Sequence, residues 1–169
     1  GSISPAGPFC AYDPPYDLEA ASVLGTWTGT GITNNTSGLF DPGTAGPGKH
    51  SITFESVPDA NGCVGEGSIE VLVMEPPYAE FLTSGFAWCE KENNQSSGDI
   101  LISGADSSTF DLILDLQGSR DTIENLSNGN ISIVLNNEPG LNQYELVKII
   151  EHHGSISCET DLFDTLIMQ

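Results

Sequence analysis

The sequence predicts an all-β chain made of two tandem β-sandwich domains, and three observations lead to this prediction. Helical periodicity is nearly absent from the 169 residues, whereas short alternations of apolar and polar residues are frequent. Nineteen glycines and ten prolines break these alternations into segments of strand length. The four cysteines fall two to each half of the chain, and the second half repeats the plan of the first.

Alternation locates the expected strands and their buried faces. In segment 110–116, Phe110, Leu112, Leu114 and Leu116 fall on one face of a strand and Asp111 and Asp115 on the other, so one face is buried and the other faces solvent. Many short antiparallel strands of this kind are typical of a sandwich or a small barrel. The expected strands are 25–32, 51–57 and 68–74 in the first half, and 100–103, 110–116, 131–135, 144–150 and 162–168 in the second.

A weak internal repeat divides the chain into domains 1–76 and 77–169. In the first half a Pro-Gly pair at 47–48 precedes a strand, a loop, Cys63 and a closing alternation that ends at Met74. In the second half a Pro-Gly pair at 139–140 precedes the same order of features, with Cys158 and Met168. The segment Glu75-Pro76-Pro77-Tyr78 is predicted to be a short stiff linker, because paired prolines stop a strand and restrict the backbone.

The cysteines are Cys10, Cys63, Cys89 and Cys158. No CxxC pair or Cys/His ligand spacing joins them, so no zinc site is predicted. Sequence alone allows three disulfide pairings, of which the tandem division selects Cys10–Cys63 and Cys89–Cys158, one in each domain. Because small domains bury little surface and disulfides form in oxidising compartments, we expect an exported protein, extracellular or on the cell surface.

The order Cys10, Trp27, Cys63 is that of immunoglobulin domains, in which a buried Trp packs on an inter-sheet disulfide. The second half departs from this order, since Trp88 directly precedes Cys89 and no Trp lies between its cysteines. Neither half has a Tyr two residues before its second cysteine. We therefore expect two tandem immunoglobulin-like β-sandwich domains that are not of the antibody type.

Five segments of the first half carry a resemblance to a known family. They are Gly25-Thr-Trp-Thr-Gly-Thr-Gly-Ile32, Gly38-Leu-Phe-Asp-Pro42, Thr44-Ala-Gly-Pro-Gly48, His50-Ser-Ile-Thr-Phe54 and Asp59-Ala-Asn-Gly-Cys63. Over residues 3–74 the chain resembles a repeat of very large secreted Bacteroidetes proteins, which include gliding-motility adhesins and other cell-surface proteins with Ig-like or PKD-like arrays. The second half is similar only in plan. The resemblance implies an extracellular array exported by the type IX route, and it carries no catalytic residue.

Charge limits the partners. Four Lys and Arg residues stand against 24 Asp and Glu residues, for a formal net charge of -20, which repels nucleic acid and anionic membranes. No apolar run approaches the roughly 20 residues of a membrane helix, so no membrane insertion is expected. The expected partners are neighbouring repeats of the same chain and surface glycans or proteins. Gly1-Ser2 resembles an expression scar, so the chain is expected to be an excised piece of a longer protein.

Calcium is the one cofactor that the composition favours, because Asp, Glu and Asn supply the hard oxygen ligands that it prefers. No EF-hand spacing occurs, and the alternative is an acidic surface that only keeps the protein soluble. The candidate ligands are Asp59, Asn61, Glu75 and Glu80, with Glu66 beside the first loop and Glu151, Glu159, Asp161 and Asp164 in the second domain.

No constellation predicts an enzyme. A glycosidase needs two carboxylates that face each other across a cleft, and no such pair is recognisable. Ser, His and Asp occur without a nucleophile elbow, and no phosphate-binding loop is present. His152 and His153 are expected at a solvated hairpin tip, because adjacent strand residues point to opposite faces. Tyr12 and Tyr16 are candidates for sugar stacking, although the two prolines between them favour packing within a connection.

The sequence therefore predicts a structural or adhesive repeat region of a large secreted cell-surface protein, acting as a rigid spacer or an adhesion module. The alternatives are a carbohydrate- or protein-binding module and an accessory domain of a secreted enzyme. A binding module predicts a concave patch lined by aromatic residues or by calcium, whereas a spacer requires no such patch.

Overall fold

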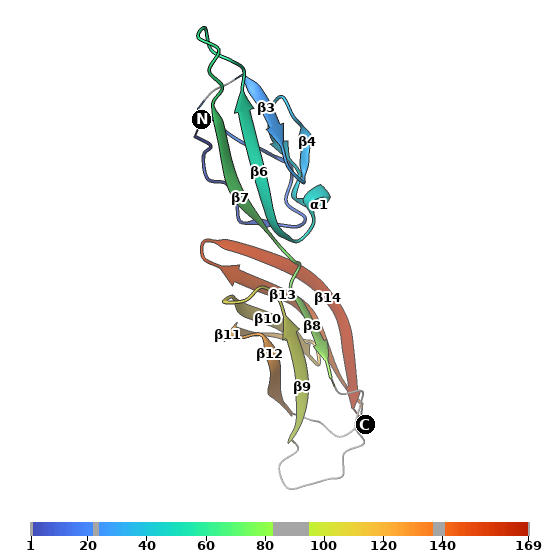
Figure 1. Ribbon diagram of the computed structural model, residues 1–169. Helices are drawn as coiled ribbons and strands as arrows, with labels where there is room; N and C mark the ends of the chain where they lie inside the picture. Colours follow the sequence, from blue (N-terminus) through green and yellow to red (C-terminus); the bar gives the residue numbers. More distant parts are fainter. Residues whose placement is uncertain (1, 22–23, 83–94, 137–140, 169) are drawn as a thin grey trace. The chain divides into compact units, whose positions relative to one another are not determined.

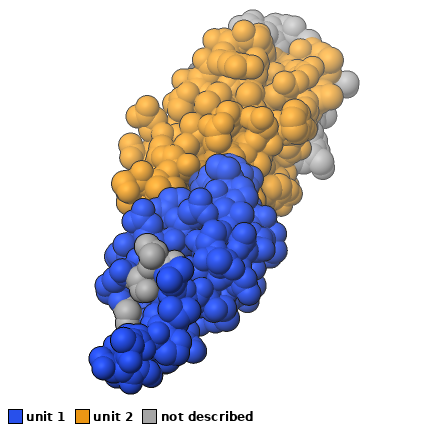
Figure 2. Space-filling view, turned by 90° about the horizontal axis from the view of Figure 1, so that it is seen from above, with its two compact units in different colours: residues 1–75 blue, residues 76–169 orange. Residues whose placement is uncertain are grey.

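The computed structural model describes residues 2–21, 24–82, 95–136 and 141–168. The chain forms two compact units, unit 1 (Gly1–Glu75) and unit 2 (Pro76–Gln169), coloured separately in Figure 2. Both units are built of strands, as Figure 1 shows, and the predicted all-β sandwich fold is confirmed. No helix in the described parts of the chain is long and apolar enough to cross a membrane.

In its described residues, unit 1 contains seven strands and one short helix. Their bounds are β1 Phe9–Cys10, β2 Tyr16–Asp17, β3 Gly25–Thr28, β4 Ile32–Asn34, β5 Leu39–Phe40, α1 Pro42–Ala45, β6 Gly48–Ser56 and β7 Glu66–Met74. One sheet has the order β1-β7-β6-β3 and the other β2-β5-β4. The predicted strand 25–32 divides into β3 and the start of β4, because Gly29 and Gly31 turn the chain at φ values of 142° and 91°.

The described part of unit 2 also contains seven strands, and β8 begins at Tyr78, inside the segment predicted to be a linker. The bounds are β8 Tyr78–Phe81, β9 Gln95–Ser103, β10 Thr109–Leu116, β11 Ser119–Leu126, β12 Gly129–Asn136, β13 Asn142–His153 and β14 Ile156–Met168. One sheet has the order β11-β10-β13-β14 and the other β12-β9-β8.

Counted in chain order within each unit, the two units share a strand plan. The third, sixth and seventh strands lie in one sheet, and the second and fifth lie in the other. This is the division of immunoglobulin-like sandwiches. The units differ in their fourth strand, because β4 pairs with β5 in unit 1 whereas β11 pairs with β10 in unit 2. They differ also in the first strand. In unit 1 the first strand, β1, pairs in parallel with the last strand, β7, whereas in unit 2 the first strand, β8, pairs with the second, β9.

Trp27 organises the core of unit 1. Its side chain is 3% exposed and its ring centroid lies 4.8 Å from that of Phe54, on the neighbouring strand β6. Gly38 approaches the indole so closely that a Cβ there would lie 2.7 Å from the ring, and its φ of 78° also suits glycine. A buried Trp on the third strand is an immunoglobulin feature. Here it packs against Phe54 and Gly38, where the sequence predicted a disulfide.

The core of unit 2 follows the predicted alternation. Phe110, Leu112 and Leu114 are fully buried on β10, and Asp111 and Asp115 lie on its opposite face. From the sheet β12-β9-β8, the residues that pack in the same core are Ala79, Ile100 and Ile102. From β13 and β14 they are Leu146, Ile149 and Leu162. The outer face of the sheet β11-β10-β13-β14 therefore carries the two carboxylates of β10.

The predicted disulfide Cys10–Cys63 is wrong. Cys10 is paired with Met74 at the end of β7, whereas Cys63 precedes the start of that nine-residue strand. A strand of this length spans about 30 Å, and a disulfide requires Cα atoms within about 7 Å. Cys63 is accordingly a free, exposed thiol.

Cys10 and Cys158 are both disulfide-bonded, and the predicted Cys89–Cys158 bond stays a prediction. Both bonded cysteines are buried. Cys89 itself lies outside the described residues. The repeat suggested equivalent places for Cys63 and Cys158, but the first lies in a loop and the second within β14.

Alkylation of the native, unreduced protein followed by peptide mapping tests this assignment. We expect complete labelling of Cys63, because its thiol is free and exposed. We also expect the peptides that contain Cys10 and Cys158 to be released only after reduction, because both cysteines are disulfide-bonded. A linked pair containing Cys10 and Cys63 would contradict the structure.

Candidate functional site

The outer face of the sheet β11-β10-β13-β14 gathers the polar side chains of unit 2 in two groups. A hydrogen-bonded network lies towards the hairpin that joins β13 to β14. A hollow lies further along the same strands, towards the other end of that hairpin. Because antiparallel residues in register project from the same face, the pairing of these four strands determines both groups.

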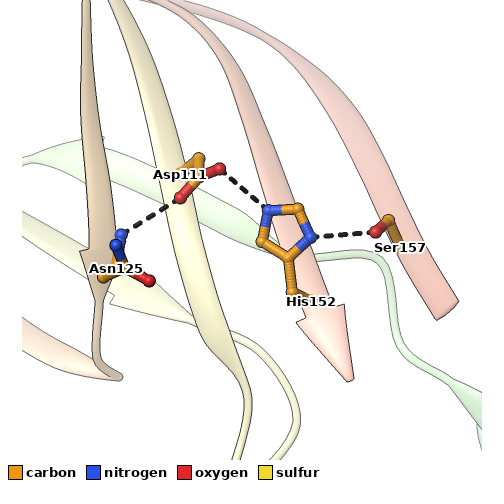
Figure 3. A network of polar contacts seen from close by, with 4 residues as sticks. All are labelled: Asp111, Asn125, His152 and Ser157. Carbon is orange, nitrogen blue, oxygen red and sulfur yellow. Dashed lines mark hydrogen bonds and ion pairs between the residues drawn. The ribbon is translucent and has the colours of Figure 1, made fainter. Parts of the chain in front are cut away.

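Figure 3 shows the first group, in which Asp111 of β10 joins three strands. Its Oδ2 accepts a hydrogen bond from His152 Nε2 of β13 at 2.9 Å, and its Oδ1 accepts one from the backbone N–H of Asn125 of β11 at 3.1 Å. His152 Nδ1 lies 2.9 Å from Ser157 Oγ of β14. Since an ionised carboxylate only accepts, Nε2 carries a proton, and in the neutral ring Nδ1 accepts from the Ser157 hydroxyl.

Two opposing effects act on the Asp111 carboxyl. Burial acts to raise its pKa, because it disfavours the charged form. The hydrogen bonds from Asn125 and His152 and the charge of His152 stabilise the carboxylate and outweigh burial, so its pKa lies below the usual value. The carboxylate is thus the acceptor that holds the network together.

The line Ser157–His152–Asp111 differs from a catalytic triad in its ring contacts. In serine hydrolases the carboxylate binds Nδ1 and the serine faces Nε2, whereas here the two contacts are exchanged. Ser157 is also the direct cross-strand partner of His152 in the β13–β14 ladder. Cross-strand pairs of this kind stabilise a sheet. The network therefore links four neighbouring strands of the sheet through hydrogen bonds.

The histidines lie at the end of a hairpin, as the sequence predicted. His152 and His153 point to opposite faces, and His153 Nδ1 lies 3.1 Å from Ser108 Oγ. The preceding Glu151 is fully buried, and its Oε1 accepts from the backbone N–H of Ala105 at 2.7 Å. Both histidines are only partly exposed, so this hairpin end is more ordered than a solvated tip.

The second group is a row of four side chains in register across the sheet. Arg120 of β11 pairs with Asp115 of β10, Asp115 pairs with Glu145 of β13, and Glu145 pairs with Thr165 of β14. At about 4.8 Å between strands, the row is roughly 14 Å long. These residues line a hollow of about 360 Å³ that also includes Val147, Asp161 and Phe163.

A change of register forms this hollow. Leu112 and Leu114 of β10 are two residues apart, but their partners on β13, Ile149 and Leu146, are three apart. The corresponding partners on β14, Thr160 and Asp164, are four apart. Extra residues in successive strands bend and twist a sheet locally. The lining residues Val147 and Phe163 lie in the stretches of β13 and β14 that contain these extra residues.

Phe163 is the most exposed large hydrophobic residue among those described, with 95% of its surface accessible. It follows the buried Leu162 on β14, so alternation directs it outward, between Asp161 and Thr165. Phe163 and Arg120 were not among the site residues predicted from the sequence. One signal in the sequence could have identified Phe163: it is an aromatic residue on the otherwise polar face of a strand whose apolar and polar residues alternate.

The structure does not bring the predicted calcium ligands together. Asp59 and Asn61 precede β7 and Glu75 follows it, so the strand separates them by about 30 Å. Asp59 Oδ1 accepts hydrogen bonds from the backbone of Cys63 and Asn61, and these lower its pKa. Glu80 accepts from the Tyr78 hydroxyl at 2.7 Å. Within the described residues no three His, Cys, Asp or Glu side chains are grouped to hold a metal ion.

The acidic residues suggested in unit 2 are also dispersed. Glu159 and Asp161 lie on the outer face, where Lys148 Nζ is 2.9 Å and 3.4 Å from their carboxylates. Asp164 instead accepts a hydrogen bond from the backbone N–H of Phe81 at 2.6 Å. Calcium binding therefore stays a prediction without a defined site. In unit 1, Tyr12 and Tyr16 are about half exposed, and Tyr16 packs on Phe9 at 5.3 Å between ring centroids.

No family model and no curated protein matches the chain. Solved structures similar to it include the fibronectin(III)-like modules of Clostridium thermocellum CbhA, at 12% identity over 92% of this chain and 88% of that chain, with a TM-score of 0.33. Another is the N-terminal four Ig domains of Dscam1 isoform 4.4, at 12% identity over 90% of this chain and 38% of that chain, also with a TM-score of 0.33. The assignment to an immunoglobulin-like sandwich rests on the strand order of each unit.

The substitution Asp111→Ala is expected to lower the free energy of unfolding of unit 2 by about 1 kcal/mol at neutral pH, because it removes a charge-assisted hydrogen-bond acceptor. Since the pKa of Asp111 is lower in the folded state, its contribution is present above the usual pKa of 3.8 and is lost as the pH falls through the folded-state value. The difference between wild type and variant should therefore shrink below about pH 4.

Urea unfolding followed through the NMR signals of unit 2 measures this difference from pH 7 to pH 2.5. Asp121→Ala is the matched control, because Asp121 is exposed and accepts only from the adjacent Thr122 backbone. A loss of stability in Asp111→Ala that is the same at every pH would contradict the assigned role of the carboxylate.

Proposed function

We propose that this chain is a non-catalytic adhesive module of an extracellular protein and that it contacts its partner through the outer face of the sheet β11-β10-β13-β14. The observation that carries the proposal is the fully exposed Phe163 beside a hollow of about 360 Å³ on that face. Hollows of this size accommodate small ligands and short polymer segments. A sandwich that served only as a spacer would need neither feature.

The extracellular location is supported by the disulfide-bonded state of Cys10 and Cys158, because disulfides persist in oxidising compartments. The formal charge of -20 keeps such a module soluble and away from nucleic acid. The resemblance of residues 3–74 to repeats of Bacteroidetes surface adhesins supports the same class of protein. Neighbouring repeats of the parent chain would then be the partners of the module within its own polypeptide.

The absence of catalysis is supported by the geometry of the Asp111–His152–Ser157 network. Its serine is fixed opposite its histidine in a strand ladder, and its ring contacts are exchanged relative to a hydrolase triad. The acidic residues around the hollow serve as hydrogen-bond acceptors. Asp115 Oδ1 accepts from the Gly118 backbone at 2.6 Å, and Glu145 Oε1 accepts from Gln143 Nε2 at 2.7 Å.

Retention of protein-coated beads under flow tests the proposal. Beads that carry the chain should adhere to at least one of three surfaces, coated with mucin, with collagen or with cellulose. Phe163→Ala should reduce the retained fraction at least tenfold, because it removes the exposed aromatic ring. Val134→Ala, which shortens an exposed side chain on β12 of the other sheet, should leave retention unchanged. Equal retention of the wild type and Phe163→Ala would contradict the proposed face.

A further inference from the structure

The geometry of the hollow points to its ligand, and we propose that it binds a neutral oligosaccharide. This inference rests on the proposed adhesive function and names the chemical class of the partner. Three properties of the hollow carry it: the presence of both hydrogen-bond donors and acceptors along the row, the exposed aromatic ring beside the row, and the balance of charge around both.

The row from Arg120 to Thr165 presents donors and acceptors side by side. The Arg120 guanidinium offers five N–H donors and has no ion-pair or hydrogen-bond partner among the described residues. Asp115 and Glu145 each use one carboxylate oxygen within their own strands or turns, and the second oxygen accepts from no described residue. The Thr165 hydroxyl both donates and accepts.

Sugar hydroxyl groups match this row because each of them also both donates and accepts a hydrogen bond. A carboxylate accepts from a hydroxyl, and a neighbouring guanidinium donates to the next one along the ring. The row is roughly 14 Å long, which suits a short oligosaccharide better than a single sugar. Its members come from four strands in register, so they are held in place before any ligand arrives.

Phe163 supplies the apolar surface that a sugar ring requires. The C–H groups of a pyranose form an apolar face, and an aromatic ring packs against such a face by dispersion and through its negative π-surface. Phe163 has no polar atom and is 95% exposed, so its ring is open to a ligand. Asp161 and Thr165 flank it on the same face of β14, and polar groups therefore lie beside the stacking surface.

The charge around the hollow selects against ionic ligands. Asp115, Glu145 and Asp161 carry three negative charges, Arg120 carries one positive charge, and Lys148 adds a second at 3.4 Å from Asp161, so the balance is negative. A sulfated or sialylated glycan would be repelled by this negative balance. A polyamine would be attracted by them but would leave the Arg120 donors unpaired and facing a like charge. A neutral polyhydroxyl ligand uses all four groups without either penalty.

A glycan array that contains neutral, sialylated and sulfated oligosaccharides tests the inference, with spermine as the cationic probe in a separate titration. We expect binding of at least one neutral oligosaccharide in the micromolar to millimolar range. Amide signals of Glu145, Phe163 and Thr165 should shift on its addition. Phe163→Ala and Arg120→Ala should each weaken binding about tenfold or more, and Val134→Ala should change it less than twofold.

The outcomes separate the two proposals. If beads of the wild type adhere, Phe163→Ala abolishes adhesion and no neutral glycan binds, the adhesive face stands and the carbohydrate assignment is wrong. Binding of spermine or of sulfated glycans alone would also overturn it. Glycan-induced shifts confined to Tyr12 and Tyr16 would move the site to unit 1. If Phe163→Ala changes neither adhesion nor glycan binding, both proposals fail.

Discussion

The outer face of unit 2 depends on how β13 pairs with the strands on either side of it. Alternation along a strand fixes which residues are buried, and a slip of one residue would exchange the two faces. β13 buries Tyr144 and Leu146 before the change of register and Ile149 and Glu151 after it. The extra residue between these pairs is what allows both halves of a twelve-residue strand to face the same core.

The same change of register links packing to the candidate site. On the core side it aligns Leu146 with Leu114 and Ile149 with Leu112. On the outer side it leaves Val147 and Phe163 in the stretches where the ladders are interrupted, and the hollow forms around them. On the N-terminal side of the register change in β13, regular pairing aligns the polar row. On its C-terminal side, regular pairing brings His152 opposite Ser157. The Asp111–His152–Ser157 network and the row from Arg120 to Thr165 are thus both consequences of strand pairing.

Much of the fold could be predicted from the sequence, because alternation is a local signal. Phe110, Leu112 and Leu114 identified a buried face that the structure confirms. The two-residue strands β1, β2 and β5 are too short to show alternation, and the two core-facing apolar residues of β11, Ile123 and Leu126, are three apart, so these strands were missed. The disulfide of the first half was predicted wrongly, because disulfide pairing depends on which strand ends meet in space. The site residues Arg120 and Phe163 escaped notice for the same reason: the row and the hollow exist only once four strands are in register.

Cross-strand NOEs between β13 and β14 test this account most directly. The structure pairs Leu146 with Asp164 and Lys148 with Asp161, so the backbone of Lys148 should show its strongest cross-strand NOEs to Asp161, and Ile149 should show them to Thr160. A ladder without the change of register would continue from Leu146–Asp164 to pair Lys148 with Leu162. Strong NOEs between Lys148 and Leu162 in place of those to Asp161 would remove the hollow and the alignment on which the proposed site depends.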